Sequence, residues 1–369
     1  MLLRITTPRH VALGLRLGYR RAFSASSSRL RRSLVFEGRT TNDGTSEAET
    51  KTRFYLDTGY SIFAKRPSRP FPPPFLSTPS HSFSDPLTTH KSVRDRRPSV
   101  EGQLVRGITN GDDAIIVGGQ NFIGVNDGVG AWAQKERGHA ALWSRLVAHY
   151  WAVEVEKAYQ QSDDVTLDQL NMVKFLQSAY EQTKHVTAEN NEIVGTTTAS
   201  SALLHHRSPD EPVVLATTLG DCAVFVIRPG AEDVVYKSKE QWHWFDCPRQ
   251  LGTNSPDTPE RNAVVDAIDV KEDDIICVVS DGVTDNLWEN EIVEKLSTCF
   301  KNWQEQKEEA KDGAVYLARE LMKAAQEVAQ DLDGESPYME RALDEGLAIS
   351  SGGKLDDISV VIGICKKRK

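Results

Sequence analysis

Four acidic segments of this chain lie where hydrophobic runs begin or end. They are Gly111–Ala114, Gly124–Gly130, Val279–Asn286 and Lys354–Ser359. Carboxylate and backbone carbonyl oxygens are the ligands that Mg²⁺ and Mn²⁺ prefer, and a pair of such ions can activate water against a phosphate ester. A single Asp-Gly pair is usually a turn. Several acidic segments at strand ends predict one shared site for cations.

The neighbours of three aspartates indicate how each carboxylate is used. Asp127 follows an apolar run and precedes Gly128, where the missing side chain lets a ligand approach the backbone closely. Asp281 follows the continuous apolar run Ile275–Val279. A carboxylate at the mouth of a buried strand is unfavourable unless it is paired or binds metal. Asp356 comes just before the last apolar run, where a strand cap is the simpler explanation.

Apolar periodicity predicts the first elements that must position these groups. Phe54–Phe63 is rich in aromatic and β-branched residues and predicts a strand. The runs Ala114–Val117 and Phe122–Val125 predict a hairpin that starts just after Asp112. Apolar side chains at helical spacing predict helices over 140–160 and 168–185.

The second half of the chain predicts further strands and helices. Period-two segments predict an antiparallel meander of Thr196–Leu204, Val213–Thr218 and Ala223–Ile227. A buried strand is expected at 275–279, helices from about 290 and over about 303–331, and a last strand at 358–365. Strands interrupted by pairs of helices favour two packed sheets with helices outside.

Composition excludes several classes of protein. The chain has 369 residues, 39% of them hydrophobic, and a net charge of −9, which makes nucleic acid an improbable partner. No apolar run approaches the roughly 18 residues that a membrane span needs. Five scattered cysteines without a CxxC pair favour buried thiols in a reducing compartment over a disulfide framework or a zinc site.

The N-terminal part differs from the rest in charge. Residues 1–36 hold eight Arg, no Lys and no acidic residue, and Ser is frequent, which is typical of a mitochondrial presequence. The segment Arg21–Ser24 resembles a matrix-peptidase cleavage site, although a disordered basic tail is the simpler alternative. Residues 37–52 are polar and predict a disordered linker. Residues 66–99, dense in Pro and Ser, predict an extended, solvated insertion.

Two other pairs of reactive residues carry weaker indications. Cys222 and Arg228 have the spacing of thiol phosphatases, but the residues between them predict a strand instead of a Gly-rich loop with free N–H groups for phosphate. His205 and His206 end a predicted strand, and neighbouring strand residues point to opposite faces. A surface loop therefore explains them better than a metal pair.

Taken in order, the acidic segments resemble the PPM-type metal-dependent serine/threonine protein phosphatases, the protein phosphatase 2C family. The resemblance covers roughly residues 53–366 and includes Gly195–Ser200 and Leu219–Cys222 between the acidic segments. Val129, Trp132, the segment 245–251 and Ser336–Tyr338 are similar to the mitochondrial branch of that family.

The resemblance implies an α+β fold, a four-layer αββα sandwich of two antiparallel β-sheets flanked by helices. It implies that Asp127 bridges two Mn²⁺ or Mg²⁺ ions per active site and that Asp281 and Asp356 complete the shell of one ion. The Gly128 carbonyl and Asp112, in part through water, would hold the other ion. A water between the ions would attack phosphorus directly, without a phosphoenzyme.

The same resemblance implies a weaker third ion at Asp221 and Asp285. Three positions depart from the family pattern. Val129 stands where many members have a His that could protonate the leaving group, and Ile108 stands where an Arg often holds substrate phosphate, with Arg106 the nearest basic residue. Asp112 replaces a more usual Glu, which still suits a contact made through water.

The prediction is therefore a metal-dependent phosphatase of the mitochondrial matrix, acting on phosphoserine and phosphothreonine of phosphorylated mitochondrial proteins. One alternative is an inactive relative that binds phosphoproteins, although the intact Asp127, Asp281 and Asp356 argue against it. Another is a hydrolase of small phosphate esters. The sequence leaves the individual substrate, the metal used in the cell and the oligomeric state open.

Overall fold

The computed structural model describes residues 34–38, 53–72, 75, 98–161, 165–189, 192–231, 233–305, 312–348 and 352–368. The predicted presequence as far as residue 33, most of the 37–52 linker and most of the 66–99 insertion lie outside these ranges. The backbone of 34–38 forms strand β1, so regular structure spans the predicted boundary at residue 36.

Two antiparallel six-stranded sheets form the centre of the fold. The first has the order β1-β2-β18-β17-β11-β12, and the second has the order β16-β10-β9-β7-β6-β5. The strands of the first sheet are β1 (Leu34–Gly38), β2 (Phe54–Ala64), β18 (Ile358–Lys367), β17 (Ile275–Val279), β11 (Ala223–Arg228) and β12 (Asp233–Lys237). Those of the second are β16 (Val264–Asp269), β10 (Glu211–Leu219), β9 (Ala199–Ser208), β7 (Phe122–Asn126), β6 (Asp113–Gly118) and β5 (Ile108–Asn110).

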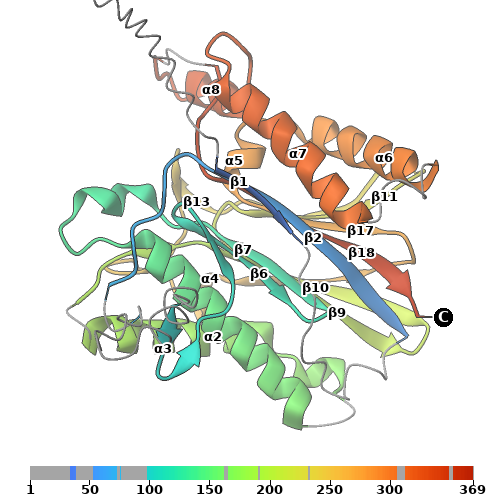
Figure 1. Ribbon diagram of the computed structural model, residues 1–369, viewed down its shortest axis with the longest axis horizontal. Coiled ribbons are helices and arrows are strands. Elements are labelled where there is room, and N and C mark those ends of the chain that lie inside the picture. The colour runs from blue at the N-terminus through green and yellow to red at the C-terminus, as the bar shows by residue number, and fades with distance from the viewer. Residues whose placement is uncertain are drawn as a thin grey trace, which may run out of the picture. The chain divides into compact units, whose positions relative to one another are not determined.

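Helices cover the outer face of each sheet (Figure 1). The helices α6 (Glu289–Glu305) and α7 (Gly313–Gln330) cover the first sheet, and α7 packs along β2 and β18. The helices α2 (Ala140–Gln161) and α3 (Met172–Glu189) cover the second, where α2 packs on β6 and β7. The predicted α+β sandwich of four layers is confirmed.

Three apolar clusters hold the layers together. One lies between α2, α3 and the second sheet and includes Trp151 and Leu146. A second lies between α6, α7 and the first sheet, and a third lies between the two sheets, where Ile123 and Val361 are fully buried. All five residues of β17 are buried, because one face of this strand packs in the cluster below α6 and α7 and the other face packs in the cluster between the sheets. This burial explains its continuous apolar run.

Shorter elements fill the connections. They are η2 (Gly130–Gln134), η3 (Leu167–Gln169), α4 (Pro259–Asn262), α5 (Asp281–Thr284) and α8 (Pro337–Asp344), with the strand pairs β3 (Ser99–Val100) with β4 (Gln103–Leu104), β8 (Thr196–Thr197) with β15 (Leu251–Gly252), and β13 (Trp242–Trp244) with β14 (Cys247–Pro248).

Two predicted elements differ from the structure. The segment 223–227 was expected to continue the meander, but β11 pairs with β17 and β12 in the other sheet. Gly220 has φ +109° and lies so close to Thr198 and to the Arg249 carbonyl that a Cβ would clash, because the chain crosses here between sheets. Strand periodicity reveals alternation but not which sheet a strand joins.

The helix predicted over 303–331 is also different. Helix α6 runs to Glu305 and α7 begins at Gly313, where the Trp303 ring occupies the space of a Cβ. The prediction that residues 66–99 are solvated is wrong at Phe71 and Phe75, which are buried in the cluster beside α2. Proline density suggested exposure, but these two aromatic rings anchor the start of the segment to the core.

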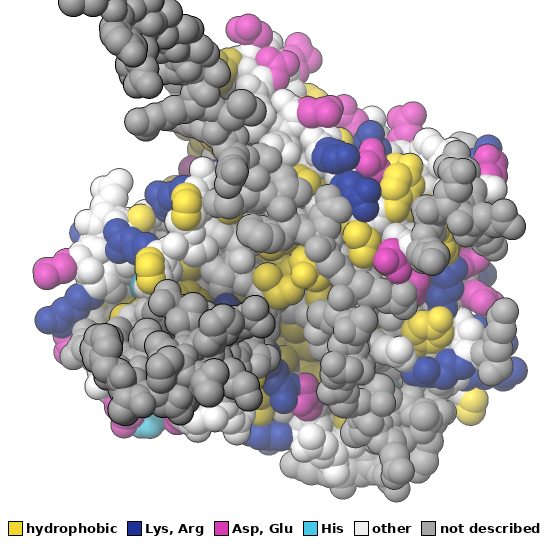
Figure 2. All heavy atoms as spheres, viewed as in Figure 1, with side chains coloured by type: hydrophobic (Ala, Val, Ile, Leu, Met, Phe, Trp, Pro, Cys, Tyr) yellow, Lys and Arg dark blue, Asp and Glu magenta, His cyan; other side chains and the backbone are white. Residues whose placement is uncertain are grey.

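Charged side chains of both signs lie next to one another on the face drawn in Figure 2. Every helix in the described ranges is too short or too polar to span a membrane. All five cysteines are free, and four of them are buried.

Candidate metal centre

Strand register brings the acidic segments together at one end of the two sheets. In the hairpin of β6 and β7, Ala114 pairs with Asn126, which places Asp127 beside Asp113. In the other sheet Val279 of β17 pairs with Val360 of β18, which places Asp281 beside the residues that precede β18. The Ser359 hydroxyl donates to the Asp113 carboxylate at 2.8 Å and joins the two sheet ends.

The backbone around Asp127 is fixed by the threonines of the 196–198 segment. The Thr198 amide and the Thr197 hydroxyl both donate to the Asp127 carbonyl at 2.8 Å, and the Asp127 amide donates to the Thr198 hydroxyl at 2.9 Å. At Gly128 a Cβ would stand 2.2 Å from the Asp112 carbonyl oxygen. Only glycine allows this approach between the two acidic segments.

Asp357 organises the site without having been predicted as part of it. Its carboxylate accepts from the Lys65 and Asp112 amides, each at 2.8 Å. Gly111 has φ +63°, and a Cβ there would stand 2.2 Å from this carboxylate. Asp357 therefore ties the turn before β6 and the end of β2 to the segment before β18.

The protonation of these carboxyls reflects their crowding. Burial and then the negative charge of Asp281 raise the pKa of Asp127 well above its usual range, and the same causes act on Asp221. Burial is the largest effect on the pKa of Asp281 and would raise it, but the Lys354 ammonium, a hydrogen bond with Asp127 and the charge of Lys65 together lower that pKa to about 2. Burial raises the pKa of Asp285 to about 7 against the opposing effect of Lys354. Crowded carboxyls hold protons that divalent ions displace.

Two buried carboxylate oxygens are oriented for a cation. Oδ1 of Asp281 and Oδ1 of Asp221 have no hydrogen-bond partner among the described residues, and both side chains are almost fully buried. Oxygens of Asp221 and Asp127 and the Sγ of Cys222 lie within 4.8 Å of one another. Leaving a buried carboxylate oxygen unpaired is costly. The donor set, mostly hard oxygens, fits Mg²⁺ or Mn²⁺.

Lysine and arginine side chains that the sequence reasoning missed surround the carboxylates. The Lys65 ammonium pairs with Asp356, and an Arg66 Nη2 donates to Asp112 Oδ2 at 2.6 Å. Lys354 pairs with Asp281 at 3.1 Å. Lys65 and Arg66 directly follow the first strand of the predicted domain, and Lys354 opens the last acidic segment, so their places in the sequence were visible signals.

The two residues predicted for a third ion lie at the same cluster but have different partners. Asp285 is 1% exposed and accepts from Lys354 at 2.6 Å and from an Arg341 Nη2. Asp221 is also buried, and its Oδ1 is one of the two unpartnered oxygens. Asp285 is therefore paired with two cations of the chain, whereas one oxygen of Asp221 accepts no hydrogen bond from the described residues.

The prediction that Arg106 is the basic residue nearest to the site is wrong. Its guanidinium pairs with Glu156 of α2, and its amide donates to His149 at 3.1 Å. The site end of α2 lies at Ser144, whose hydroxyl donates to the Asp112 carbonyl. Glu156 is about 18 Å further along the helix at 1.5 Å per residue. Ile108 pairs with Ile115 from the edge strand β5 and is half-buried, so it supplies no charge to the site.

The cysteine, arginine and histidine residues that the sequence analysis considered make contacts that stabilise the fold. Arg228 forms two hydrogen bonds with Asp274, far in the register from Cys222 at the opposite end of β11. The predicted surface loop at His205 is wrong, because β9 continues to Ser208 and the Tyr159 hydroxyl lies 3.2 Å from the His205 ring. A loop was predicted at these two His residues because the predicted strand ended at Leu204, whereas β9 continues beyond them.

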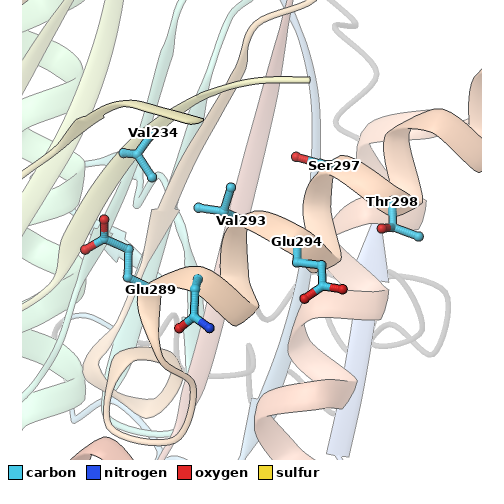
Figure 3. A pocket seen from close by; sticks show the side chains of 7 residues that line it. Val234, Glu289, Val293, Glu294, Ser297 and Thr298 are labelled. Carbon is cyan, nitrogen blue, oxygen red and sulfur yellow. The ribbon is translucent and has the colours of Figure 1, made fainter. Parts of the chain in front are cut away.

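A separate hollow of about 700 Å³ lies between β12 and α6. Figure 3 shows Val234 facing Val293 and Glu289 across it, with Glu294 and Thr298 along the same helix. None of the carboxylates described above lines this hollow, so it is distinct from the acidic cluster.

Comparison with known proteins agrees with this geometry. The family model described as protein phosphatase 2C matches residues 102–331. The chain is 29% identical over 271 residues to a probable protein phosphatase 2C 1 of Oryza sativa subsp. japonica, which covers 70% of this chain and 71% of that protein. It is 28% identical over 275 residues to the protein phosphatase PTC7 homolog of Homo sapiens, covering 72% and 82%. Other plant relatives are longer, and the chain spans 40 to 65% of their length.

A solved structure is similar as well. The X-ray structure of the photosystem II phosphatase PBCP matches with a TM-score of 0.54 and 26% identity. The match covers 69% of this chain and 91% of that one.

Proposed function

Since this chain belongs to the protein phosphatase 2C family, we propose that it is a metal-dependent protein serine/threonine phosphatase of mitochondria. It hydrolyses phosphoserine and phosphothreonine on mitochondrial proteins and uses two Mn²⁺ or Mg²⁺ ions per active site. The observation that carries the proposal is the meeting of Asp127, Asp281 and Asp356 from three separate strand ends. The unpartnered oxygens beside them support it.

The proposed ligand roles follow the family pattern that these residues match. Asp127 would contribute to both ions. Asp281 and Asp356 would hold one ion, and the Gly128 carbonyl and Asp112 would hold the other, in part through water. When bound, the ions supply an activated water and positive charge against the phosphate.

The chain itself orients these ligands. Thr197 and Thr198 bond both the carbonyl and the amide of Asp127, which fixes the backbone that carries the carboxylate. Asp357 holds the turn that carries Asp112. Preorganised ligands of this kind do not have to rearrange during the reaction.

Arg66 is the cation we assign to substrate phosphate. Its guanidinium bonds Asp112 with one nitrogen, and its side chain is 47% exposed at the rim of the cluster. A planar guanidinium with five donors can keep this bond and still bind a phosphate oxygen. Arg66, which follows β2, would thus bind the substrate phosphate that the apolar Ile108 of β5 is unable to bind.

Location in the mitochondrial matrix is proposed from residues 1–36 and their arginine content. Similarity to a PTC7 homolog supports it through the mitochondrial branch that the motifs resemble. A fusion of residues 1–36 to a fluorescent protein should enter mitochondria, and replacing its arginines with glutamine should leave it in the cytosol. Cytosolic fluorescence of the unchanged fusion contradicts the location.

Phosphate release by the full chain tests the activity. A phosphothreonine peptide and a small phosphate ester are compared with Mn²⁺, with Mg²⁺ and with EDTA. We expect phosphate release to depend on metal, and we expect kcat/KM to be higher for the peptide than for the small ester. A folded protein that binds the peptide without release would instead support the phosphoprotein-binding alternative, and preference for the small ester would support the other.

A further inference from the structure

We propose that the side chains of Lys354 and Arg341 take the position of the weaker third ion, so that this chain binds two metal ions and not three. The inference rests on the proposed function, because it concerns the same acidic cluster. It departs from the expectation that Asp221 and Asp285 hold an ion between them. Two cations of the chain already pair with Asp285.

The Lys354 ammonium lies beside Asp285 and is hydrogen-bonded to three carboxylates. Its Nζ lies 2.6 Å from Asp285 Oδ2, 3.1 Å from Asp281 Oδ2 and 2.9 Å from Asp246 Oδ1. An ammonium has three N–H donors, and three carboxylates accept them. The Tyr338 ring lies beneath the ammonium at 4.8 Å and favours a cation there.

Arg341 supplies the second positive charge. One nitrogen of its guanidinium bonds Asp285 Oδ1, and another lies 3.0 Å from Glu240 Oε2. Both oxygens of Asp285 therefore accept from cations of the chain, whereas Lys65 bonds only Oδ1 of Asp356 and Arg66 bonds only Oδ2 of Asp112. Two single charges equal that of one divalent ion, and an added ion would stand close to both and be repelled.

The backbone fixes both side chains in place. The Lys354 amide donates to the Asn286 Oδ1 and its carbonyl accepts from the Asn286 Nδ2, each at 2.9 Å. The Tyr338 amide donates to the Asp285 carbonyl at 3.0 Å, which positions α8 and Arg341 within it. These clamps do not depend on the ammonium, so they hold the position open when the side chain is shortened.

Two other carboxylate oxygens of the cluster have no such partner. Oδ1 of Asp281 and Oδ1 of Asp221 accept nothing from the described part of the chain, and Asp221 offers an oxygen within 4.8 Å of Asp127. Asp221 can thus offer an oxygen to the proposed pair of ions from beside Asp127. Asp285 belongs with the chain's own cations.

The number of bound ions tests the proposal. Metal-stripped full chain is equilibrated with millimolar Mn²⁺, and bound Mn²⁺ is counted by equilibrium dialysis and native mass spectrometry. Lys354→Ala and Lys354→Ser open the position. Lys366→Ala is the matched control, because Lys366 also pairs with an aspartate, Asp273, and lies over an aromatic ring, that of Trp303, away from the cluster. Circular dichroism verifies that each variant is folded.

The expected counts are two ions in the wild type and in Lys366→Ala, and three in Lys354→Ala and Lys354→Ser. Three ions in the wild type would overturn the inference even if neither Lys354 variant folds. A folded Lys354 variant that still binds two would overturn it as well. Fewer than two ions in the wild type would instead contradict the metal centre itself, and the inference would fail with it.

Discussion

The two sides of the acidic cluster bury their carboxylates in different ways. Around Asp285 both carboxylate oxygens accept from Lys354 and Arg341, which the chain holds in place. Around Asp127 the nearby Oδ1 atoms of Asp221 and Asp281 have no partner in the described ranges. A tethered cation makes its side a fixed part of the structure, whereas unpartnered oxygens leave the other side to an exchangeable ion.

Asp281 lies on the boundary between the two sides. Its Oδ2 is 3.1 Å from the Lys354 ammonium, and its Oδ1 is one of the unpartnered oxygens. The comparison therefore predicts that a substitution removes activity on one side and stability on the other.

The largest effect is expected at Asp127. In Asp127→Asn the bridging carboxylate is lost while the shape is kept, and metal catalysis is worth several kcal/mol, so kcat should fall on the order of a thousandfold. Phosphate release from a phosphothreonine peptide measures it. Circular dichroism should be unchanged, since the Asp127 backbone bonds to Thr197 and Thr198 remain. Wild-type activity in this variant would remove Asp127 from the centre.

On the other side, Asp285→Asn should act on stability. The change leaves Lys354 and Arg341 with one carboxylate fewer, and removing one partner of a buried pair costs about 3 kcal/mol or more. Because these cations are 18% and 32% exposed, we expect about 2 kcal/mol. Urea unfolding without metal measures it, and activity should stay within about tenfold of wild type. A loss of activity as large as that of Asp127→Asn would erase the distinction between the two sides.

A smaller effect is expected at the rim. Arg66→Met removes the guanidinium assigned to substrate phosphate, and one charge-assisted hydrogen bond is worth about 1.5 kcal/mol or more, so KM for a phosphopeptide should rise roughly tenfold. Arg106→Gln is the comparison variant, because Arg106 pairs with Glu156 instead. Its KM should be within about twofold of wild type by the same reasoning. If Arg106→Gln alone raised KM, the assignment would pass to that arginine.

The smallest effect is expected at Cys222. Burial and the charges of Asp127 and Asp221 raise the pKa of its thiol well above the ordinary value, so it stays protonated and is a poor nucleophile. Cys222→Ser should therefore retain activity within about twofold, because a hydroxyl can keep the contact with Thr198. Complete loss in this variant would reopen the thiol mechanism that the Cys222 and Arg228 spacing suggested.

Most of the fold and the acidic residues of the site could be predicted from the sequence. Apolar periods predicted strands near β2, β6, β7 and β18, and acidic residues at their ends predicted the cluster, because both depend on local spacing. Strand β11 was assigned to the wrong sheet, since a pairing partner is not encoded by alternation.

The basic half of the site was missed for a physical reason. Lys65 and Arg66 follow a predicted strand and Lys354 opens an acidic segment, but most Lys and Arg residues are simply exposed, so these places were weak signals. They become informative only when the carboxylates that face them are placed by the register of two different sheets. Phe75 was missed in the same way, because its buried position depends on a distant cluster beside α2.

A single Mn²⁺ titration of the metal-stripped full chain tests the central claim most directly. Bound Mn²⁺ and phosphate release from a phosphothreonine peptide are followed in the same samples. We expect no release without metal and a plateau of release when two ions are bound. Full release from the metal-free protein, or none from a folded protein with two ions bound, would contradict it.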